Sequence, residues 1–445
     1  MEVRKVRFEA FKSLYGVECD LDHLTVLTGP NGSGKSNFVE ALHFLGEVYA
    51  HGLEFAVSRA GGYDNLAHRR TRRAKHPISV MVEVVITAAD FRGDPSTSIF
   101  LGPHVEHDIA DDYRITYRHS FAMKTAGQSL LSDFTVKEDR VEVLDQNHEP
   151  IAILTGGTDA TIEVWTSPKR LKADPIAAAA LRPFGDKRYL GVYQERTLLP
   201  TALITDQMFY ANLLFMVKRA LAGTNVFQLS PFQCRTAGVS TPNAVLERHG
   251  ENLPGAADHL RRNDSGAWKQ VQGAMRSILP DLIAIEIVHT EDRRLALQFR
   301  ERGLGRPWNT GEVSDGTIQA LALFIALYDQ RTPLLVVEEP ENSVHPWILR
   351  QFLDLVRNVA GKQVVLTTHS PVLLNYVSPE MVRLISMSNG RSQIGRLLDA
   401  SAELQDLVKS GDLSLFDAYD SGVLIETVPR GLAPSADLAG GELDR

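Results

Sequence analysis

The feature that most constrains this chain is a glycine-rich loop between an apolar strand and an apolar helix. The loop, Gly29-Pro30-Asn31-Gly32-Ser33-Gly34-Lys35-Ser36, matches G-x-x-x-x-G-K-[ST] in full. It follows a strand expected at 24–27 and opens a helix expected at 38–48. Glycines let successive backbone N–H groups face phosphate oxygens, and the helix N-terminus adds positive potential. A chance glycine-rich turn is the alternative, and the strand and helix on either side disfavour it.

The last residues of the loop carry the chemistry expected of such a motif. Lys35 can reach the β- and γ-phosphates of a nucleotide, and the Ser36 hydroxyl can ligate Mg²⁺. The sequence therefore predicts ATP and Mg²⁺ as cofactors, with Lys35 as a catalytic residue and Ser36 as a metal ligand. The predicted nucleotide-binding set contains these two residues and Gly29, Asn31, Gly32, Ser33, Gly34 and Asn37.

A second apolar strand, expected at 334–337, ends in two carboxylates, Glu338 and Glu339. A central parallel strand is apolar throughout, and the ends of such strands are where α/β folds place their ligands. We expect Glu338 to hold Mg²⁺, directly or through water. We expect Glu339 to orient and deprotonate the attacking water. The alternative is a surface turn that happens to be acidic.

A histidine follows the next apolar strand, in the segment Thr367-Thr368-His369-Ser370-Pro371. From a strand end beside Glu339, His369 can contact the γ-phosphate or the attacking water, and we predict a catalytic role. The alternative is a hydrogen-bonded histidine with a purely structural role. The position of His369 at a strand end favours the functional interpretation.

A further anion-binding segment is predicted where Ser314, Asp315 and Gly316 precede an apolar helix at 319–327. Ser314 is a good N-cap, and the N-terminus of the helix attracts anions. Simple capping is the alternative. An anion site here requires a second chain, because one nucleotide cannot touch two distant helix N-termini of one subunit.

Together these motifs resemble the ABC-type ATPases of the RecF/SMC branch, and more narrowly the AAA-family ATPases of prokaryotic anti-phage and genome-maintenance loci. The loop at 29–36 resembles Walker A, residues 314–317 the signature, residues 338–346 Walker B with the D-loop, and residues 368–371 the switch histidine. Residues 6–14 and 250–254 resemble two further family segments. The resemblance implies an ATP-sandwiched dimer, in which each nucleotide lies between one subunit's loop and its partner's signature.

The implied fold class is α/β, a P-loop ABC-type ATPase head with a mixed sheet, an antiparallel elaboration in lobe I and a helical insert. Short strands such as 113–117 and 140–144 predict the elaboration, and apolar spacing at 209–221 and 256–279 predicts helices. The sequence has no sustained heptad repeat, so we do not expect a long coiled coil. The expected parts are lobe I at 1–200, the insert at 201–283, lobe II at 284–428 and a disordered acidic tail at 429–445. Gln194 and Gln233 are the candidates for the family's magnesium-contacting glutamine.

Composition bounds the remaining possibilities. Two cysteines, no apolar run of membrane length and no signal peptide predict a cytoplasmic protein without a membrane partner. The net charge of −8 disfavours a whole-surface nucleic-acid binder but permits a local patch. Such a patch is weakly predicted on a loop that holds Arg69, Arg70, Arg72, Arg73 and Lys75. The alternatives are a solvated loop or a docking site for an acidic partner.

The leading functional hypothesis is an ATP-driven switch, a homodimer or higher oligomer, that acts on DNA or on a separate nuclease or toxin effector, in anti-phage defence or DNA maintenance. About fifty residues follow 386–396 without a strand-borne acidic cluster, so no nuclease is expected in this chain. The alternative is a nucleotide-gated scaffold that holds a partner protein, with hydrolysis as a slow release step. A transporter ATPase subunit is disfavoured by the Ser-Asp-Gly-Thr signature.

Overall fold

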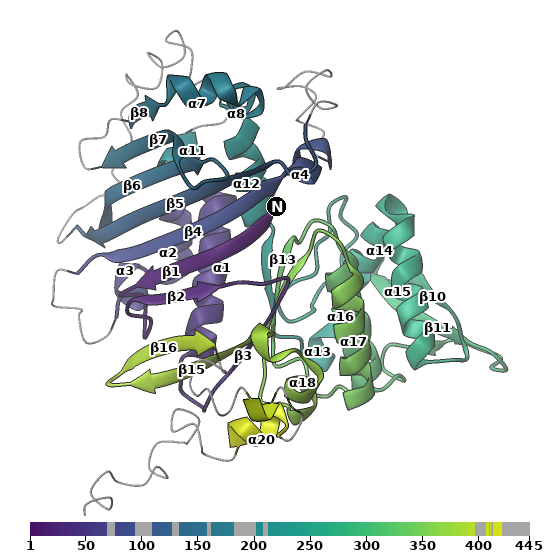
Figure 1. Ribbon diagram of the computed structural model, residues 1–445. Helices are drawn as coiled ribbons and strands as arrows, with labels where there is room; N and C mark the ends of the chain where they lie inside the picture. The colour runs from purple at the N-terminus through teal and green to yellow at the C-terminus, as the bar shows by residue number, and fades with distance from the viewer. Residues whose placement is uncertain are drawn as a thin grey trace, which may run out of the picture.

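The computed structural model describes residues 1–68, 76–93, 109–126, 133–157, 162–181, 202–207, 212–396, 406–408, 410 and 413–420. Within them the chain forms a seven-stranded, a six-stranded and a three-stranded sheet (Figure 1). The basic loop at 69–75, Gln194 and the acidic tail predicted at 429–445 lie outside the described residues. Among the described helices, none has the length and hydropathy that crossing a bilayer requires.

The seven-stranded sheet is antiparallel throughout, and it is the elaboration predicted for lobe I. Its residues alternate between a buried and a more exposed face, most regularly along β4. It is a separate sheet, not an extension of the six-stranded one. In spatial order its strands are β2 (Val17–Asp20), β1 (Glu2–Glu9), β4 (Ile78–Thr87), β5 (Arg114–Thr125), β6 (Phe134–Leu144), β7 (Pro150–Gly157) and β8 (Ile162–Thr166).

The six-stranded sheet combines strands from both ends of the described chain. Its neighbours pair in parallel except for the antiparallel pair β15–β16. Every residue of β3, β13 and β14 is buried, as expected for central parallel strands. In spatial order the strands are β16 (Arg391–Arg396), β15 (Val382–Ser388), β3 (Leu24–Thr28), β14 (Gln363–Thr367), β13 (Leu334–Glu338) and β9 (Thr224–Phe227).

The two faces of this sheet belong to two separate hydrophobic cores. Along β13, Leu334 and Val336 pack into the core shared with α1 (Lys35–His51) and the antiparallel sheet. Leu335 and Val337 point to the other face and pack into the core shared with α16 (Asp315–Tyr328) and α17 (Pro346–Asn358). Helices α1 and α16 therefore lie on opposite sides of the sheet, as Figure 1 shows.

The segment predicted as a helical insert, 201–283, is not entirely helical. It contributes β9, an edge strand paired with β13, because the β-branched and aromatic residues of Thr224–Phe227 fit a half-buried sheet edge. The amphipathic stretch at 256–279 is divided into two helices, since the Asp264 side chain accepts from Ala267 N at 2.9 Å and starts a new one. The helices here are α11 (Ile204–Gln207), α12 (Asn212–Ala222), α13 (Pro231–Cys234), α14 (Leu253–Asn263) and α15 (Ser265–Ile278).

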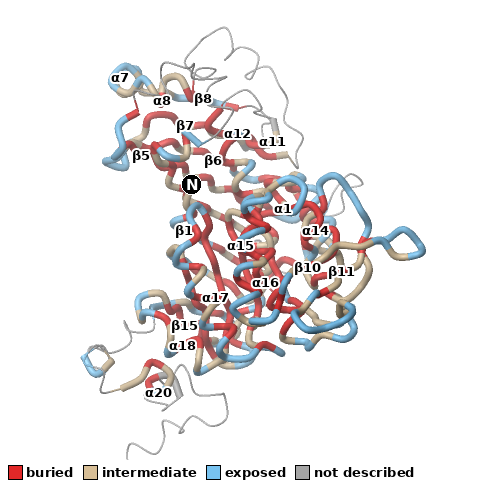
Figure 2. The backbone as a smooth tube through the Cα atoms, turned by 90° about the vertical axis from the view of Figure 1, so that its right-hand side faces the viewer, coloured by how far each residue is buried: buried red, intermediate tan, exposed pale blue. Residues whose placement is uncertain are grey.

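The remaining elements surround these layers. Strands β10 and β11 form an antiparallel hairpin, and its turn projects as an exposed loop (Figure 2). The third sheet consists of β10 (Leu282–His289), β11 (Leu295–Glu301) and β12 (Trp308–Asn309). The other helices are α2 (Leu53–Arg59), α3 (Tyr63–Leu66), α4 (Ala88–Gly93), α7 (Pro168–Ala173), α8 (Pro175–Ala180), α18 (Pro371–Tyr376), η1 (Pro379–Met381) and α20 (Leu415–Asp420).

Candidate nucleotide site

Three neighbouring strand ends bring the predicted motifs to one edge of the six-stranded sheet. Strand β14 lies between β3 and β13. Beyond the paired strands, Thr368 N donates to Leu27 O at 3.0 Å and Glu339 N donates to Thr367 O at 3.0 Å. The glycine-rich loop, the His369 segment and the two glutamates therefore leave the sheet side by side, at its carboxyl edge.

The glycine-rich loop is held against β16, a contact that the sequence did not reveal. Gly34 has φ 110°, and a Cβ atom added there would lie 2.0 Å from Ser392 Oγ. Ser392 Oγ in turn donates to Ser33 O at 2.8 Å. Asn37 is directed away from the open side of the loop, because its amide donates to Ser13 Oγ at 2.7 Å. Gly34 is thus fixed both by its backbone conformation and by its neighbour.

Lys35 is buried beneath the loop, and the hydrogen-bond acceptors of its ammonium are neutral backbone carbonyls. Its ammonium donates to Gly29 O at 2.8 Å and to Pro30 O at 3.2 Å. Burial lowers the pKa of Lys35 to about 8, while the charges of Glu339 and Glu341 oppose that shift. A phosphate group would supply the negative charge that this desolvated ammonium lacks.

Glu339 is held in a left-handed backbone conformation at the end of β13, with φ 45°. Such a conformation is uncommon for a residue with a side chain, and it persists only where surrounding contacts fix it. Here the Glu339 N–H faces both the carbonyl and the hydroxyl oxygens of Thr367. The carboxylate accepts from Asn342 Nδ2 at 3.0 Å. These contacts fix where the Glu339 carboxylate lies.

His369 reaches the same site, where its surroundings lower its pKa. Burial lowers the pKa of His369, the positive charge of Lys35 lowers it further, and Glu339 opposes both effects. Glu341 holds the segment in place, since its Oε1 accepts from Thr368 Oγ1 at 2.8 Å and from His369 N at 2.9 Å. The sequence placed Glu341 in a family motif without suggesting this tie.

Several buried polar atoms around the loop make no hydrogen bond within the described part of the chain. They are Thr28 Oγ1, Ser33 Oγ, Glu341 Oε2 and His369 Nε2. Buried polar groups are normally paired, so an unpaired cluster at one strand edge fits a polar ligand. On the open side of the loop, Asn31, Gly32 and Ser36 are exposed. The donor set and the buried ammonium therefore fit a bound triphosphate.

Glu338, the predicted magnesium ligand, is ion-paired to an arginine that the sequence did not single out. Arg248 Nη2 lies 2.9 Å from Glu338 Oε1, and the Glu338 side chain is only 8% exposed. Arg248 belongs to the irregular segment between α13 and α14, which carried no recognisable motif beyond the resemblance at 250–254.

The signature residues lie at the start of α16, on the far side of the sheet from α1. Ser314 caps this helix, with its hydroxyl accepting from Thr317 N at 3.2 Å. Gly316 allows close packing, because an added Cβ would lie 2.9 Å from Ser343 O. Arg235 braces the segment by pairing with Asp315 at 2.6 Å and donating to Val313 O at 2.8 Å. Ser314 and Asp315 remain exposed.

A glutamine at the site edge was missed by the sequence reasoning. Gln228 immediately follows β9, the strand beside β13, and its side chain is exposed. Gln233, one of the two candidates, lies on α13 further along the chain. Gln194, the other candidate, lies outside the described residues. The signal that could have found Gln228 was the short apolar strand before it, in a region interpreted as helical.

Two sequence comparisons found proteins similar to this chain, and the family match covers the parts that carry these motifs. A family described as "AAA domain, putative AbiEii toxin, Type IV TA system" matches residues 24–85 and 235–375. The DNA replication and repair protein RecF of Trichlorobacter lovleyi is 26% identical over 184 residues. That match spans 36% of this chain and 44% of the RecF protein, so the chain covers less than half of its relative's length.

Solved structures similar to this chain include heads of SMC proteins. An SMC head bound to the C-winged helix domain of ScpA is 13% identical, with a TM-score of 0.46, over 89% of this chain and 98% of that one. The SMC head domain from Thermotoga maritima is 15% identical, with a TM-score of 0.37, over 89% and 99%. In motif order, in the geometry of the strand ends and in its sequence matches, this chain resembles the ABC-type ATPases of the RecF/SMC branch.

Proposed function

We propose that the chain binds and hydrolyses ATP as a homodimer. The observation that supports this most directly is the convergence of Lys35, Glu339 and His369, each of which lies within the electrostatic reach of another. A phosphate-release assay on the purified protein with ATP and Mg²⁺ tests hydrolysis. Absence of release at every protein concentration would contradict the proposal.

The proposed roles follow from the contacts of each side chain. Lys35 turns from the loop carbonyls to the β- and γ-phosphates, which restore its charge balance. Ser36 and Glu338 would hold Mg²⁺, which supplies charge neutralisation for the phosphates when bound. Glu339 accepts the proton of the attacking water, and the neutral His369 directs Nε2 at the γ-phosphate. Gln228, at the end of β9, is our candidate for the family's glutamine.

The signature segment provides the argument for a second copy of the chain. Helices α1 and α16 lie on opposite faces of the sheet, so we expect the N-terminus of α16 to serve a nucleotide held by another subunit. Two large apolar side chains flank that N-terminus, Phe232 on α13 at 76% exposed and Trp347 on α17 at 60% exposed. Exposed aromatic residues are enriched at protein interfaces. We propose that a partner subunit covers them when ATP is bound.

We propose a biological role that couples this ATP-dependent association to DNA or to a nuclease or toxin effector. The matched relative's name refers to DNA replication and repair, and the matched family's description refers to a toxin system. The second candidate is a nucleotide-gated scaffold, in which release alone requires hydrolysis. An in vivo assay of a Glu339→Gln variant separates the two, because the scaffold keeps its output without turnover whereas the switch loses it.

Replacing His369 by alanine is expected to slow hydrolysis about 10²-fold while ATP affinity changes little, because the lost Nε2 contact matters most as charge develops on the γ-phosphate. Single-turnover phosphate release and equilibrium binding of a fluorescent ATP analogue measure the two effects. Unchanged turnover would mean that His369 has only a structural role.

Neutralising Arg69, Arg70, Arg72 and Arg73 is expected to weaken DNA binding and to reduce its dependence on salt, because each phosphate contact releases counterions. A mobility-shift assay titrated with salt measures both quantities. The matched control neutralises four other arginines that already pair with acidic side chains, Arg92, Arg294, Arg300 and Arg306. Equal salt slopes in the two variants would eliminate the patch.

A further inference from the structure

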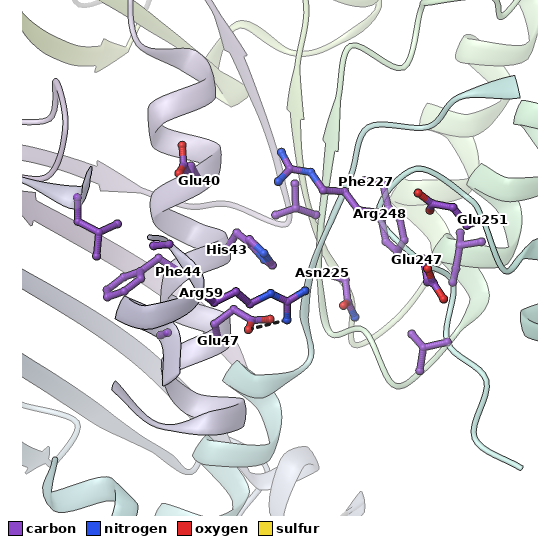
Figure 3. Close-up of a pocket in the computed structure, with 16 residues that line it drawn as sticks. Glu40, His43, Phe44, Glu47, Arg59, Asn225, Phe227, Glu247, Arg248 and Glu251 are labelled. Carbon is purple, nitrogen blue, oxygen red and sulfur yellow. Dashed lines mark hydrogen bonds and ion pairs between the residues drawn. The ribbon is translucent and has the colours of Figure 1, made fainter. Parts of the chain in front are cut away.

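A cavity of about 610 Å³ runs beside α1 and is lined on both sides by charged side chains (Figure 3). Glu40, His43 and Glu47 reach it from α1, and Arg59 comes from α2. The opposite wall is β9 together with the segment at 245–251. In Figure 3, Arg248 points from that wall across the cavity towards α1. Nothing in the proposed ATPase cycle uses this cavity.

Arg248 links the cavity to the proposed metal site. Its Nη2 lies 2.9 Å from Glu338 Oε1, while its side chain is 38% exposed. Its Nε atom is buried and makes no hydrogen bond with the described residues. Apart from Glu338, the guanidinium therefore has few fixed partners. The guanidinium is held by an ion pair with one carboxylate, and the cavity gives its side chain space to move.

A metal ion bound through Glu338 Oε1 would lie close to the Arg248 guanidinium, because Mg²⁺ takes its oxygen ligands at about 2.1 Å. Like charges at such separations also repel strongly where solvent is restricted. Glu338 is nearly buried, so a cation must stay beside it in either state.

We infer that Arg248 is the resident counter-ion of Glu338 and competes there with Mg²⁺, which displaces it towards the cavity through charge repulsion. This inference rests on the proposed function, and it makes Arg248 a positioning residue that acts through Glu338. The cavity can receive the displaced guanidinium, since Glu40 and Glu247 line it. The backbone of the Arg248 segment stays in place during this movement, because Gln228 N donates to Arg248 O at 2.9 Å and Ser230 N donates to His249 O at 3.1 Å.

The test is the Mg²⁺ concentration that gives half-maximal binding of a fluorescent ATP analogue. Arg248→Gln is expected to lower this concentration about tenfold, because a competing cation is removed from a largely buried carboxylate. Arg248→Lys keeps the charge and should retain the wild-type requirement. Arg59→Gln is the matched control, since Arg59 lines the same cavity but pairs with Glu47 at 3.0 Å.

An unchanged or higher Mg²⁺ requirement in Arg248→Gln would overturn the inference, while wild-type binding would leave the proposed function intact. Failure of the wild type to bind the analogue at any Mg²⁺ concentration would instead overturn the proposed function. Arg248→Met keeps the aliphatic stem and removes the charge, so it gives the same reading if the glutamine variant does not fold. Thermal unfolding without nucleotide verifies folding of each variant.

Discussion

Glu339→Gln is expected to bind ATP, accumulate as an ATP-bound dimer and lose turnover by about 10³-fold, because the base that accepts the proton of water is removed while the shape is kept. The glutamine retains an oxygen that can accept from Asn342, and the left-handed backbone depends on Thr367 and not on the carboxylate. Phosphate release measures turnover, and light scattering with and without ATP measures the dimer.

The matched control for this prediction is Glu341→Gln. Both acids act on the charge of Lys35, so each substitution changes the local charge by the same amount. Glu341 holds the backbone of His369 through one oxygen, which glutamine can still supply. We expect Glu341→Gln to keep turnover within about tenfold of the wild type, since it removes no base from the reaction. Similar losses in both variants would mean that charge, and not proton transfer, explains the effect.

Lys35→Ala is expected to abolish measurable ATP binding, a loss of at least about 10²-fold in affinity, because each hydrogen bond from a charged donor contributes ~1.5–3 kcal/mol. Without nucleotide the variant should be at least as stable as the wild type, since a desolvated ammonium is removed. Thermal unfolding with and without ATP measures both effects. Lys362→Met is the matched control, because Lys362 is also buried and donates to two backbone carbonyls, away from the loop.

The same lysine predicts how ATP affinity depends on pH. Burial lowers the pKa of Lys35 to about 8, and a bound phosphate favours the charged form. Binding therefore takes up a proton above about pH 8, and the affinity of the wild type should fall as the pH rises beyond that value. An affinity that stays constant from pH 7 to pH 10 would show that Lys35 remains charged without nucleotide.

The parts of the site that could be predicted from the sequence are the motifs formed by consecutive residues. Lys35 follows an apolar strand and a glycine-rich turn, and Glu338 ends another apolar strand, so local sequence alone places each at a strand end. Apolar runs of helix or strand length likewise predicted α1, α16, β13 and β14, and β13 and β14 are buried along their whole length.

Other contacts depend on residues that meet only after folding. Arg248 is paired with Glu338, ninety positions away, and Ser392 rests on a loop more than three hundred residues earlier. Neither residue stands in a pattern that marks it, since an arginine or a serine in an irregular segment is ordinary. β9 was missed for a related reason: four residues are too short for a period to emerge, and pairing with β13 determines the strand.

The place of β3 in its sheet has a consequence for synthesis on the ribosome. This strand pairs on one side with β14 and on the other with β15, both made more than three hundred residues later. Until residues 363–384 emerge, Val26 and Leu27 lack both strand neighbours, so the nascent chain carries an unpaired apolar strand throughout that interval. Strand pairing between such distant segments is slow, so it favours binding of the nascent chain by chaperones. Truncated chains that lack these strands would not complete the sheet.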